Sequence, residues 1–367
     1  MNRSETFMEP ENFVTFELVV HGFLVLIIGT IGIIGNIFCL LVLCRPSMRN
    51  SINCLFIGLA FIDILLILSA FVMFSLPAFQ VYVERKFMWN VIDVYQYTTP
   101  FVYPIAMITQ TASVYMTLTI ALERYLVVCL PLKSRSICTY GRAKRCVFTV
   151  IIFSTSYNVT RFLEYSFETF VIDEERGITV TFLQSTDLRE NPLYISIYIN
   201  WLYMVFMCLV PFSVLFLVNL RIAWGIRQAR MERSRISSSQ RNEESLAIML
   251  MVIVFIFIAC NTPAMISNIM ETFQIQAVKL TQISNLLIVF NSSISIFIYT
   301  TFSRKFRRIL LQVWHRKRPE DDVLFRWKAE GGPNLTGNRS TRTISARRGA
   351  RVLTATTSLE FQREISS

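Results

Sequence analysis

Hydrophobic residues in this chain occur in long runs that are almost free of charge and are separated by short polar segments. A run of about 18 or more such residues matches a hydrocarbon core roughly 30 Å thick and indicates a membrane-spanning helix. Runs of this length do not fit the short alternating strands of a β-barrel. Seven runs qualify: Leu18–Cys44, Ile52–Phe79, Thr98–Cys129, Cys146–Leu163, Leu193–Ile222, Ser245–Met270 and Leu280–Thr301. The pattern predicts an all-α membrane protein, a seven-transmembrane helix bundle over residues 18–302.

The positive charges predict the orientation of this bundle. Of the 36 Lys and Arg residues, 29 lie in segments that are cytoplasmic if residues 1–17 are extracellular. Positive charge is retained on the cytoplasmic side of membranes, so we expect the N-terminus outside and the basic tail inside. The formal charge of +11 then reflects topology and contact with anionic lipid headgroups, not binding of nucleic acid. No cleavable signal peptide is recognisable, so the first helix is expected to act as its own insertion signal.

The segments between and beyond the helices carry three further predictions. The loop after the fourth helix is rich in β-branched and aromatic residues at Phe167–Ile172 and Ile178–Phe182, which favours a β-hairpin. After the seventh helix, residues 303–315 read as an amphipathic helix on the membrane surface, and 316–367 as a disordered cytoplasmic tail. Asn2 lies in a glycosylation sequon. Phe302, Phe306, Ile309, Leu310 and Val313 share the apolar face of the amphipathic helix.

Asp63 stands in the middle of the second predicted helix, where an ionised side chain is costly and marks a functional site. Partners at a similar depth are Asn36, Ser113, Asn291 and Ser292. A set of oxygen ligands around one carboxylate suits a hard cation such as Na⁺ as an allosteric ion. The alternative is a hydrogen-bonded structural carboxylate without an ion.

Glu123, Arg124 and Tyr125 close the third predicted helix at its cytoplasmic end. Glu243 lies 20 residues before Pro263 of the sixth helix, which places it about 30 Å lower at roughly 1.5 Å per residue. Arg124 would then bridge Glu123 and Glu243 and form a latch between two helices. The alternative is that these charges only face lipid headgroups.

Several motifs together give the chain a resemblance to a known superfamily. Gly35-Asn36, the Leu-Ala-x-x-Asp63 pattern, Glu-Arg-Tyr125 and the prolines Pro211 and Pro263 resemble rhodopsin-type (class A) G-protein-coupled receptors. Three longer stretches resemble the invertebrate FMRFamide-type neuropeptide receptors: Ala121–Ala143, Tyr157–Glu164 and Asn291–Ser293.

This resemblance implies a receptor that binds a short amidated peptide among the outer helix ends and passes the signal to a heterotrimeric G protein. It implies that Arg124 contacts the G protein, that Tyr299 repacks in the seventh helix, and that Asp63, Ser113, Asn291 and Ser292 match the family's sodium site. Receptor kinases and arrestin are further partners expected at the Ser- and Thr-rich tail. The candidate ligand contacts are Ala106, Gln110, Glu164 and Glu271.

The chain also departs from the superfamily. The usual cysteine at the top of the third helix is Thr99, and none of the eight cysteines falls in a predicted extracellular segment, so no outer disulfide is expected. The seventh helix reads Ser295–Tyr299 where relatives have Asn-Pro-x-x-Tyr, and Asn261 replaces the tryptophan two residues before Pro263. These differences indicate a divergent member.

Other functions fit the sequence less well. Ala106 stands where aminergic receptors place an aspartate, and Val289 where opsins place the retinal lysine. His21 and His315, the two histidines, lie on opposite sides of the membrane, so no His-based catalytic or metal site can assemble and we expect no enzyme. Neither broken-helix repeats nor inverted symmetry suggests a transporter. The remaining alternative is a nematode-style chemoreceptor of the same fold for small environmental molecules.

Overall fold

The computed structural model describes residues 15–80, 85–173, 178–231, 238–273 and 275–314. Within this part of the chain, seven helical segments are long and apolar enough to cross a membrane. They confirm the predicted seven-helix bundle, and we refer to them in chain order as spans one to seven. Their bounds are Thr15–Leu43, Ser51–Phe79, Val94–Cys129, Tyr140–Leu163, Pro192–Gln228, Ile248–Thr272 and Val278–Phe302.

Each span is built from one or more helical elements. The α-helices of the bundle are α2 (Val25–Leu43), α3 (Ser51–Ala70), α4 (Leu76–Gln80), α5 (Arg85–Cys129), α7 (Tyr140–Asn158), α9 (Pro192–Tyr194), α10 (Val210–Met231), α11 (Ser238–Thr272), α12 (Val278–Ser293) and α13 (Ser295–Phe302). Wider π-helical turns interrupt spans one, two and five at Leu18–Leu24, Phe71–Ser75, Ile195–Leu202 and Met204–Leu209. Span four ends in the 3₁₀ turn Val159–Leu163, which leads directly into the hairpin.

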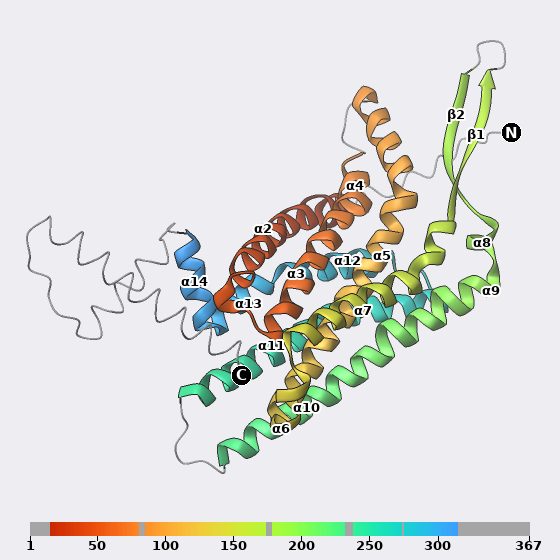
Figure 1. The fold of residues 1–367 in the computed structure, drawn as a ribbon. Helices are drawn as coiled ribbons and strands as arrows, with labels where there is room; N and C mark the ends of the chain where they lie inside the picture. The colour runs from red at the N-terminus through yellow and green to blue at the C-terminus, as the bar shows by residue number, and fades with distance from the viewer. Residues whose placement is uncertain (1–14, 81–84, 174–177, 232–237, 274, 315–367) are drawn as a thin grey trace, which may run out of the picture. The chain divides into compact units, whose positions relative to one another are not determined.

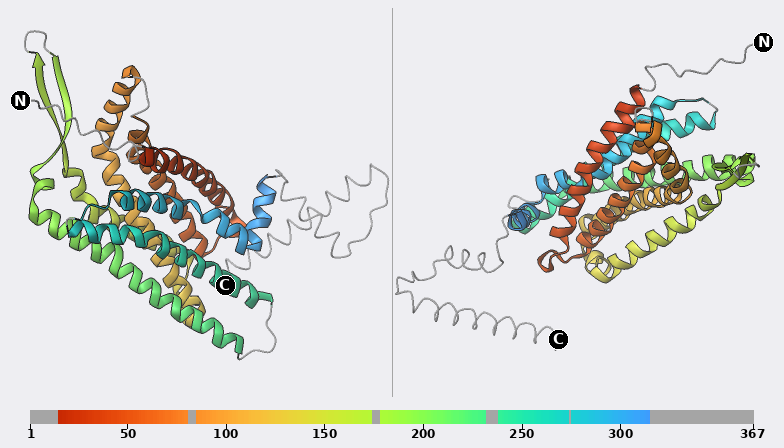
Figure 2. Two further views of the ribbon diagram at one scale, coloured as in Figure 1. Left: turned by 180° about the vertical axis from the view of Figure 1, so that it is seen from behind. Right: turned by 90° about the horizontal axis from the view of Figure 1, so that it is seen from above.

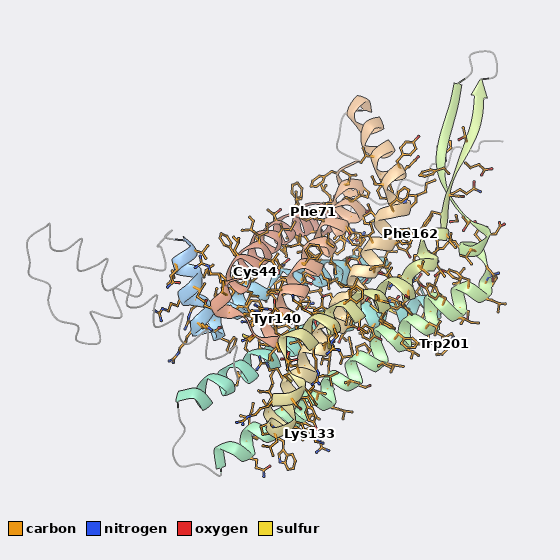
Figure 3. All side chains as sticks on the ribbon, in the orientation of Figure 1. Cys44, Phe71, Lys133, Tyr140, Phe162 and Trp201 are labelled. Carbon is orange, nitrogen blue, oxygen red and sulfur yellow. The ribbon has the colours of Figure 1, made fainter. Side chains whose placement is uncertain are left out.

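The spans close into a ring around span three (Figures 1 and 2). Helix α5 of span three packs against α3, α7, α10 and α11, while α2 of span one packs against both α3 and α12. The ring is therefore closed between the first and last spans. Large apolar side chains face outward from the helices, for example Trp201, which is 55% exposed (Figure 3). An apolar outer surface is what a helix bundle in lipid requires.

Glycines allow span one to approach its neighbours closely. A Cβ atom on Gly32 would meet Ser293 of α12 and lie 2.9 Å from Ile67 of α3. A Cβ atom on Gly29 would meet the ring of Phe71. Small residues at such contacts let helix backbones pack in a membrane without a hydrophobic driving force.

The hairpin predicted after span four is present. Strands β1 (Tyr165–Asp173) and β2 (Ile178–Ser185) pair antiparallel, with a register shift between Val171 and Asp173. The strands are longer than the predicted Phe167–Ile172 and Ile178–Phe182, and their turn lies outside the described residues. The short helix α8 (Asp187–Glu190) then joins the hairpin to span five.

The amphipathic helix after span seven is also present, as α14 (Arg304–Trp314). Phe306 and Ile309 are buried, and Leu310 and Val313 pack against the same core, whereas Leu311 is 58% exposed. The Lys305 ammonium donates to the backbone carbonyl of Ser47 at 2.6 Å. Helix α14 and the hairpin lie at opposite ends of the bundle (Figure 1).

Some element bounds differ from those predicted. Helices α5 and α11 begin earlier than Thr98 and Ser245, because helical structure continues into polar residues beyond the apolar runs. The segment after span three forms a short helix, α6 (Pro131–Ile137), which hydropathy could not reveal. Proline at the first position of α6 suits a helix start, since its missing N–H has no partner to lose there.

Candidate functional site

A cavity of about 320 Å³ opens among the spans at the hairpin end of the bundle. We call it the hairpin-side cavity. It receives residues from spans two to seven and from α8, so it depends on the packing of all spans but the first. Its wall combines apolar side chains with polar and charged ones, a composition that suits a ligand with both kinds of group. Its lining residues include Tyr103, Ala106, Gln110, Arg161, Arg189, Tyr203 and Glu271.

Three of the four predicted ligand contacts line this cavity. Ala106 and Gln110 lie one helical turn apart on α5, and Glu271 lies near the end of α11. The Gln110 amide donates to the hydroxyl of Tyr203 at 3.4 Å, which fixes one polar group on the wall. Glu271 is exposed and supplies a carboxylate to a cavity bounded mainly by neutral side chains.

Glu164, the fourth, is placed differently from our expectation of a free carboxylate facing the ligand. Its side chain is 0% exposed and does not line the cavity. It lies 3.3 Å from the Arg161 guanidinium and 3.6 Å from that of Arg189, and it accepts a hydrogen bond from Tyr194 at 2.8 Å. A buried carboxylate needs such partners, so Glu164 is already occupied.

Arg161 and Arg189 were not singled out from the sequence, although both line the cavity. Arg161 carried a usable signal, because an ionisable residue inside a predicted span marks a functional position. Arg189 gave no such signal in the sequence, since it lies in a polar loop. It lines the cavity only because the chain folds back toward the bundle after the hairpin.

The predicted polar cluster around Asp63 is assembled. Asp63 is 2% exposed, and Oδ1 of its carboxylate accepts hydrogen bonds from Ser113 at 3.0 Å and from Ser292 at 2.9 Å. The Asn36 amide donates to the backbone carbonyl of Ser292 at 2.9 Å. Spans two, three and seven therefore meet at one carboxylate, and span one joins them through Ser292.

A small cavity of about 20 Å³ adjoins this cluster and is lined by Asp63, Ser113, Asn291 and Tyr299, among others. A volume of this size accommodates roughly one water molecule or small ion. The oxygen-rich donor set fits a hard cation, and the buried Oδ1 of Asn36 has no hydrogen-bond partner among the described residues. The geometry is therefore compatible with the predicted allosteric Na⁺.

At the opposite end, Glu123 and Arg124 are 9% and 5% exposed, and Glu123 lies beside Ser51 and Arg124. Tyr125 lines a groove of about 340 Å³ between spans three and five, together with Arg221 and Trp224. Tyr299 is buried, with its ring 4.8 Å from Phe56 and 5.5 Å from Phe306 of α14.

Two predicted residues lie outside the part of the structure that describes side chains. Glu243 belongs to α11, but its side chain is not among those described, so the latch to Arg124 stays a prediction. Asn2 precedes the first described residue, and its glycosylation likewise stays a prediction.

Comparison with known proteins agrees with this architecture. The family model described as 7 transmembrane receptor (rhodopsin family) matches residues 35–299. The chain belongs to the rhodopsin family of seven-transmembrane receptors. This receptor is 41% identical over 308 residues to the FMRFamide receptor of Drosophila melanogaster, covering 83% of the chain and 56% of that protein. It is 32% identical over 298 residues to the FMRFamide peptide receptor frpr-18 of Caenorhabditis elegans, covering 78% of the chain and 67% of that protein.

A vertebrate relative is more distant. The human thyrotropin-releasing hormone receptor is 30% identical over 156 residues, which cover 42% of this chain and 37% of that protein. The family assignment and the seven spans make the protein a multi-pass membrane receptor. The chain spans little more than half the length of the Drosophila relative.

Proposed function

We propose that this receptor binds a short, amidated, FMRFamide-like neuropeptide in the hairpin-side cavity and transmits binding to a heterotrimeric G protein. The relatives named as FMRFamide receptors carry this proposal, because the similarity extends over most of the chain. They favour a peptide over the small environmental molecules of the chemoreceptor alternative. Glu271 supports it as well, since a cavity carboxylate can pair with the arginine of an Arg-Phe-amide peptide.

The test is a calcium readout in cells that express the receptor with a promiscuous G protein. We expect peptides that end in Arg-Phe-amide to activate it and their free-acid versions to fail. Glu271→Gln should lower potency roughly 10-fold or more for these peptides, because a charge-assisted contact is lost. Glu190→Gln is the matched control, since Glu190 is exposed on α8 and does not line the cavity. Silence toward every amidated peptide at normal surface expression would refute the proposal.

We infer that the hairpin end is extracellular and the α6 end cytoplasmic, which follows from the distribution of Lys and Arg. The same proposal includes four further points. The receptor lies in the plasma membrane, segment 1–17 is extracellular, α14 lies at the membrane surface, and the tail 316–367 recruits kinases and arrestin. An epitope at residue 1 that is stained on intact cells, and one at residue 367 that is stained only after permeabilisation, would support this orientation.

The groove between spans three and five supports a G-protein site at the cytoplasmic end, with Arg124 as the contact that opening of the bundle releases. Na⁺ bound by Asp63, Ser113, Asn291 and Ser292 would supply a positive charge that favours the ionised carboxylate and holds spans two, three and seven together. An ion that stabilises one arrangement of the bundle biases a two-state equilibrium and so acts as an allosteric effector.

A further inference from the structure

The cluster around Glu164 ties the ends of the hairpin to three spans. Arg161 belongs to the last turn of span four, Arg189 to α8 after the hairpin, and Tyr194 to the start of span five. All three side chains contact the same buried carboxylate. A guanidinium nitrogen of Arg161 also donates to the Tyr103 hydroxyl of span three at 2.6 Å. These contacts hold Arg161 and Arg189 at the cavity wall.

The charges in this cluster do not cancel. Two guanidinium groups face one carboxylate, which leaves one net positive charge at the cavity wall. Glu271, the acidic group that also lines the cavity, makes no ion pair with either arginine among the described residues. The cavity is therefore dipolar, with a carboxylate contributed by span six and an excess cation contributed by the hairpin side.

The two arginines contribute differently to the cavity wall. The side chain of Arg189 is 29% exposed, so it retains donor capacity toward the cavity. Arg161 is 3% exposed and adds a buried positive charge beside it. A guanidinium binds carboxylate or carbonyl oxygens in a fixed geometry. A ligand oxygen at this wall would accept a hydrogen bond from Arg189 and would be attracted by the charge of Arg161.

We propose that Arg161 and Arg189 form a subsite for an oxygen acceptor of the ligand, either a carboxylate side chain or a backbone carbonyl of the peptide. Glu164 acts as a positioning residue that holds the two guanidinium groups in the wall. This subsite rests on the proposed peptide receptor function. In it, the cationic group of the ligand binds at Glu271, and an acceptor group of the ligand binds at the two arginines.

The test compares wild type, Arg189→Met and the control Glu190→Gln against an amidated peptide series. In each peptide one residue upstream of the C-terminal Arg-Phe-amide is Asp, Asn or Ala. Methionine keeps the aliphatic length of arginine and removes the donors. We expect Arg189→Met to lower potency at least about 10-fold, because a hydrogen bond to a charged group is lost. A loss of potency confined to one Asp peptide identifies the acceptor as that carboxylate. An equal loss of potency for all peptides identifies it as a backbone carbonyl.

Potencies for Arg189→Met within about twofold of wild type on every peptide would overturn the subsite, as would an equal loss in Glu190→Gln. The positioning role of Glu164 is tested with Glu164→Gln. Its readout is the set of potencies across the peptide series at matched surface expression, which should shift from that of wild type toward that of Arg189→Met, whether the loss is confined to an Asp peptide or equal for all. Potencies equal to those of wild type on every peptide would overturn that role.

The same peptides, in amidated and free-acid form, are then added to purified receptor and the thermal unfolding midpoint is measured. If no amidated peptide activates the wild type, the proposed function fails, and the midpoint decides the subsite by itself. Carboxylate-bearing peptides that raise the midpoint of wild type but not of Arg189→Met support the subsite. No shift in wild type with any peptide overturns it.

Discussion

Replacing Glu164 by alanine should destabilise the receptor strongly, because it removes the one carboxylate shared by two arginines and a tyrosine. Arg161 would keep its hydrogen bond to Tyr103 and its ring contact with Tyr198, whose centroid lies 5.1 Å from the guanidinium carbon. It would lose its counter-ion while remaining 97% buried, as its 3% exposure implies. Glu164→Gln keeps an acceptor for Tyr194 but removes the charge.

The expected magnitude follows from the burial of the pair. Removing one partner of a buried ion pair costs about 3–5 kcal/mol, which we assign to Glu164→Ala. Loss of the charge alone should cost about 1.5–3 kcal/mol in Glu164→Gln, the range for hydrogen bonds to charged groups. Replacing both partners by apolar groups is often close to neutral, so Arg161→Met should recover part of the loss in the Glu164→Ala background.

The assay is the thermal unfolding midpoint of the detergent-solubilised receptor, with the amount of monodisperse receptor as a second readout. We expect the midpoint to fall from wild type to Glu164→Gln and again to Glu164→Ala. The double variant, Glu164→Ala with Arg161→Met, should have a higher midpoint than Glu164→Ala. Glu168→Ala is the control, since Glu168 is an exposed residue on β1 and should change stability by less than about 0.5 kcal/mol. A midpoint for Glu164→Ala equal to that of the control, or a double variant as unstable as the sum of its single changes, would refute the reasoning.

Three further predictions concern the rest of the bundle. Asp63→Asn should abolish any sodium dependence of agonist affinity measured by radioligand competition; a sodium effect that persists would place the ion elsewhere. Glu243→Ala should raise basal signalling by weakening the latch to Arg124, and unchanged basal activity in a variant that still responds to agonist would remove the latch. Gly32→Leu should lower surface expression severalfold because its side chain would meet Ser293, whereas Gly141→Leu should express normally, since no atom lies within 4 Å of a Cβ there.

The seven spans, the hairpin and the amphipathic helix could be predicted because each is a local pattern. An apolar run must be about 20 residues long to cross the hydrocarbon core, whatever packs beside it. Apolar residues spaced at Phe306, Ile309, Leu310 and Val313 give α14 one apolar face before any partner is known. Helix ends could not be predicted as well, because α5 and α11 continue into polar residues that hydropathy does not count.

In the candidate site, too, some residue roles could be predicted from the sequence and others could not. Asp63 was found from the sequence, because a carboxylate in the middle of a span is costly and needs partners, and Ser113 and Ser292 supply them. Glu164 was assigned to the ligand because it lies near a helix end that faces the bundle. Its role could not be read from that position, since its partners Arg189 and Tyr194 follow 25 and 30 residues later, beyond the hairpin.

The sequence by itself thus determined the features that follow from the preference of each residue for lipid or water. These are the spans, the excess of positive charge on one side and the buried carboxylate. The tertiary structure decided which distant charges meet. Arg161 pairs with Glu164 three residues along the same turn, but Arg189 reaches this carboxylate only because the hairpin returns the chain to the end of span four. Ion pairing acts over a few ångströms in space, and the distance between two residues along a chain does not fix that separation.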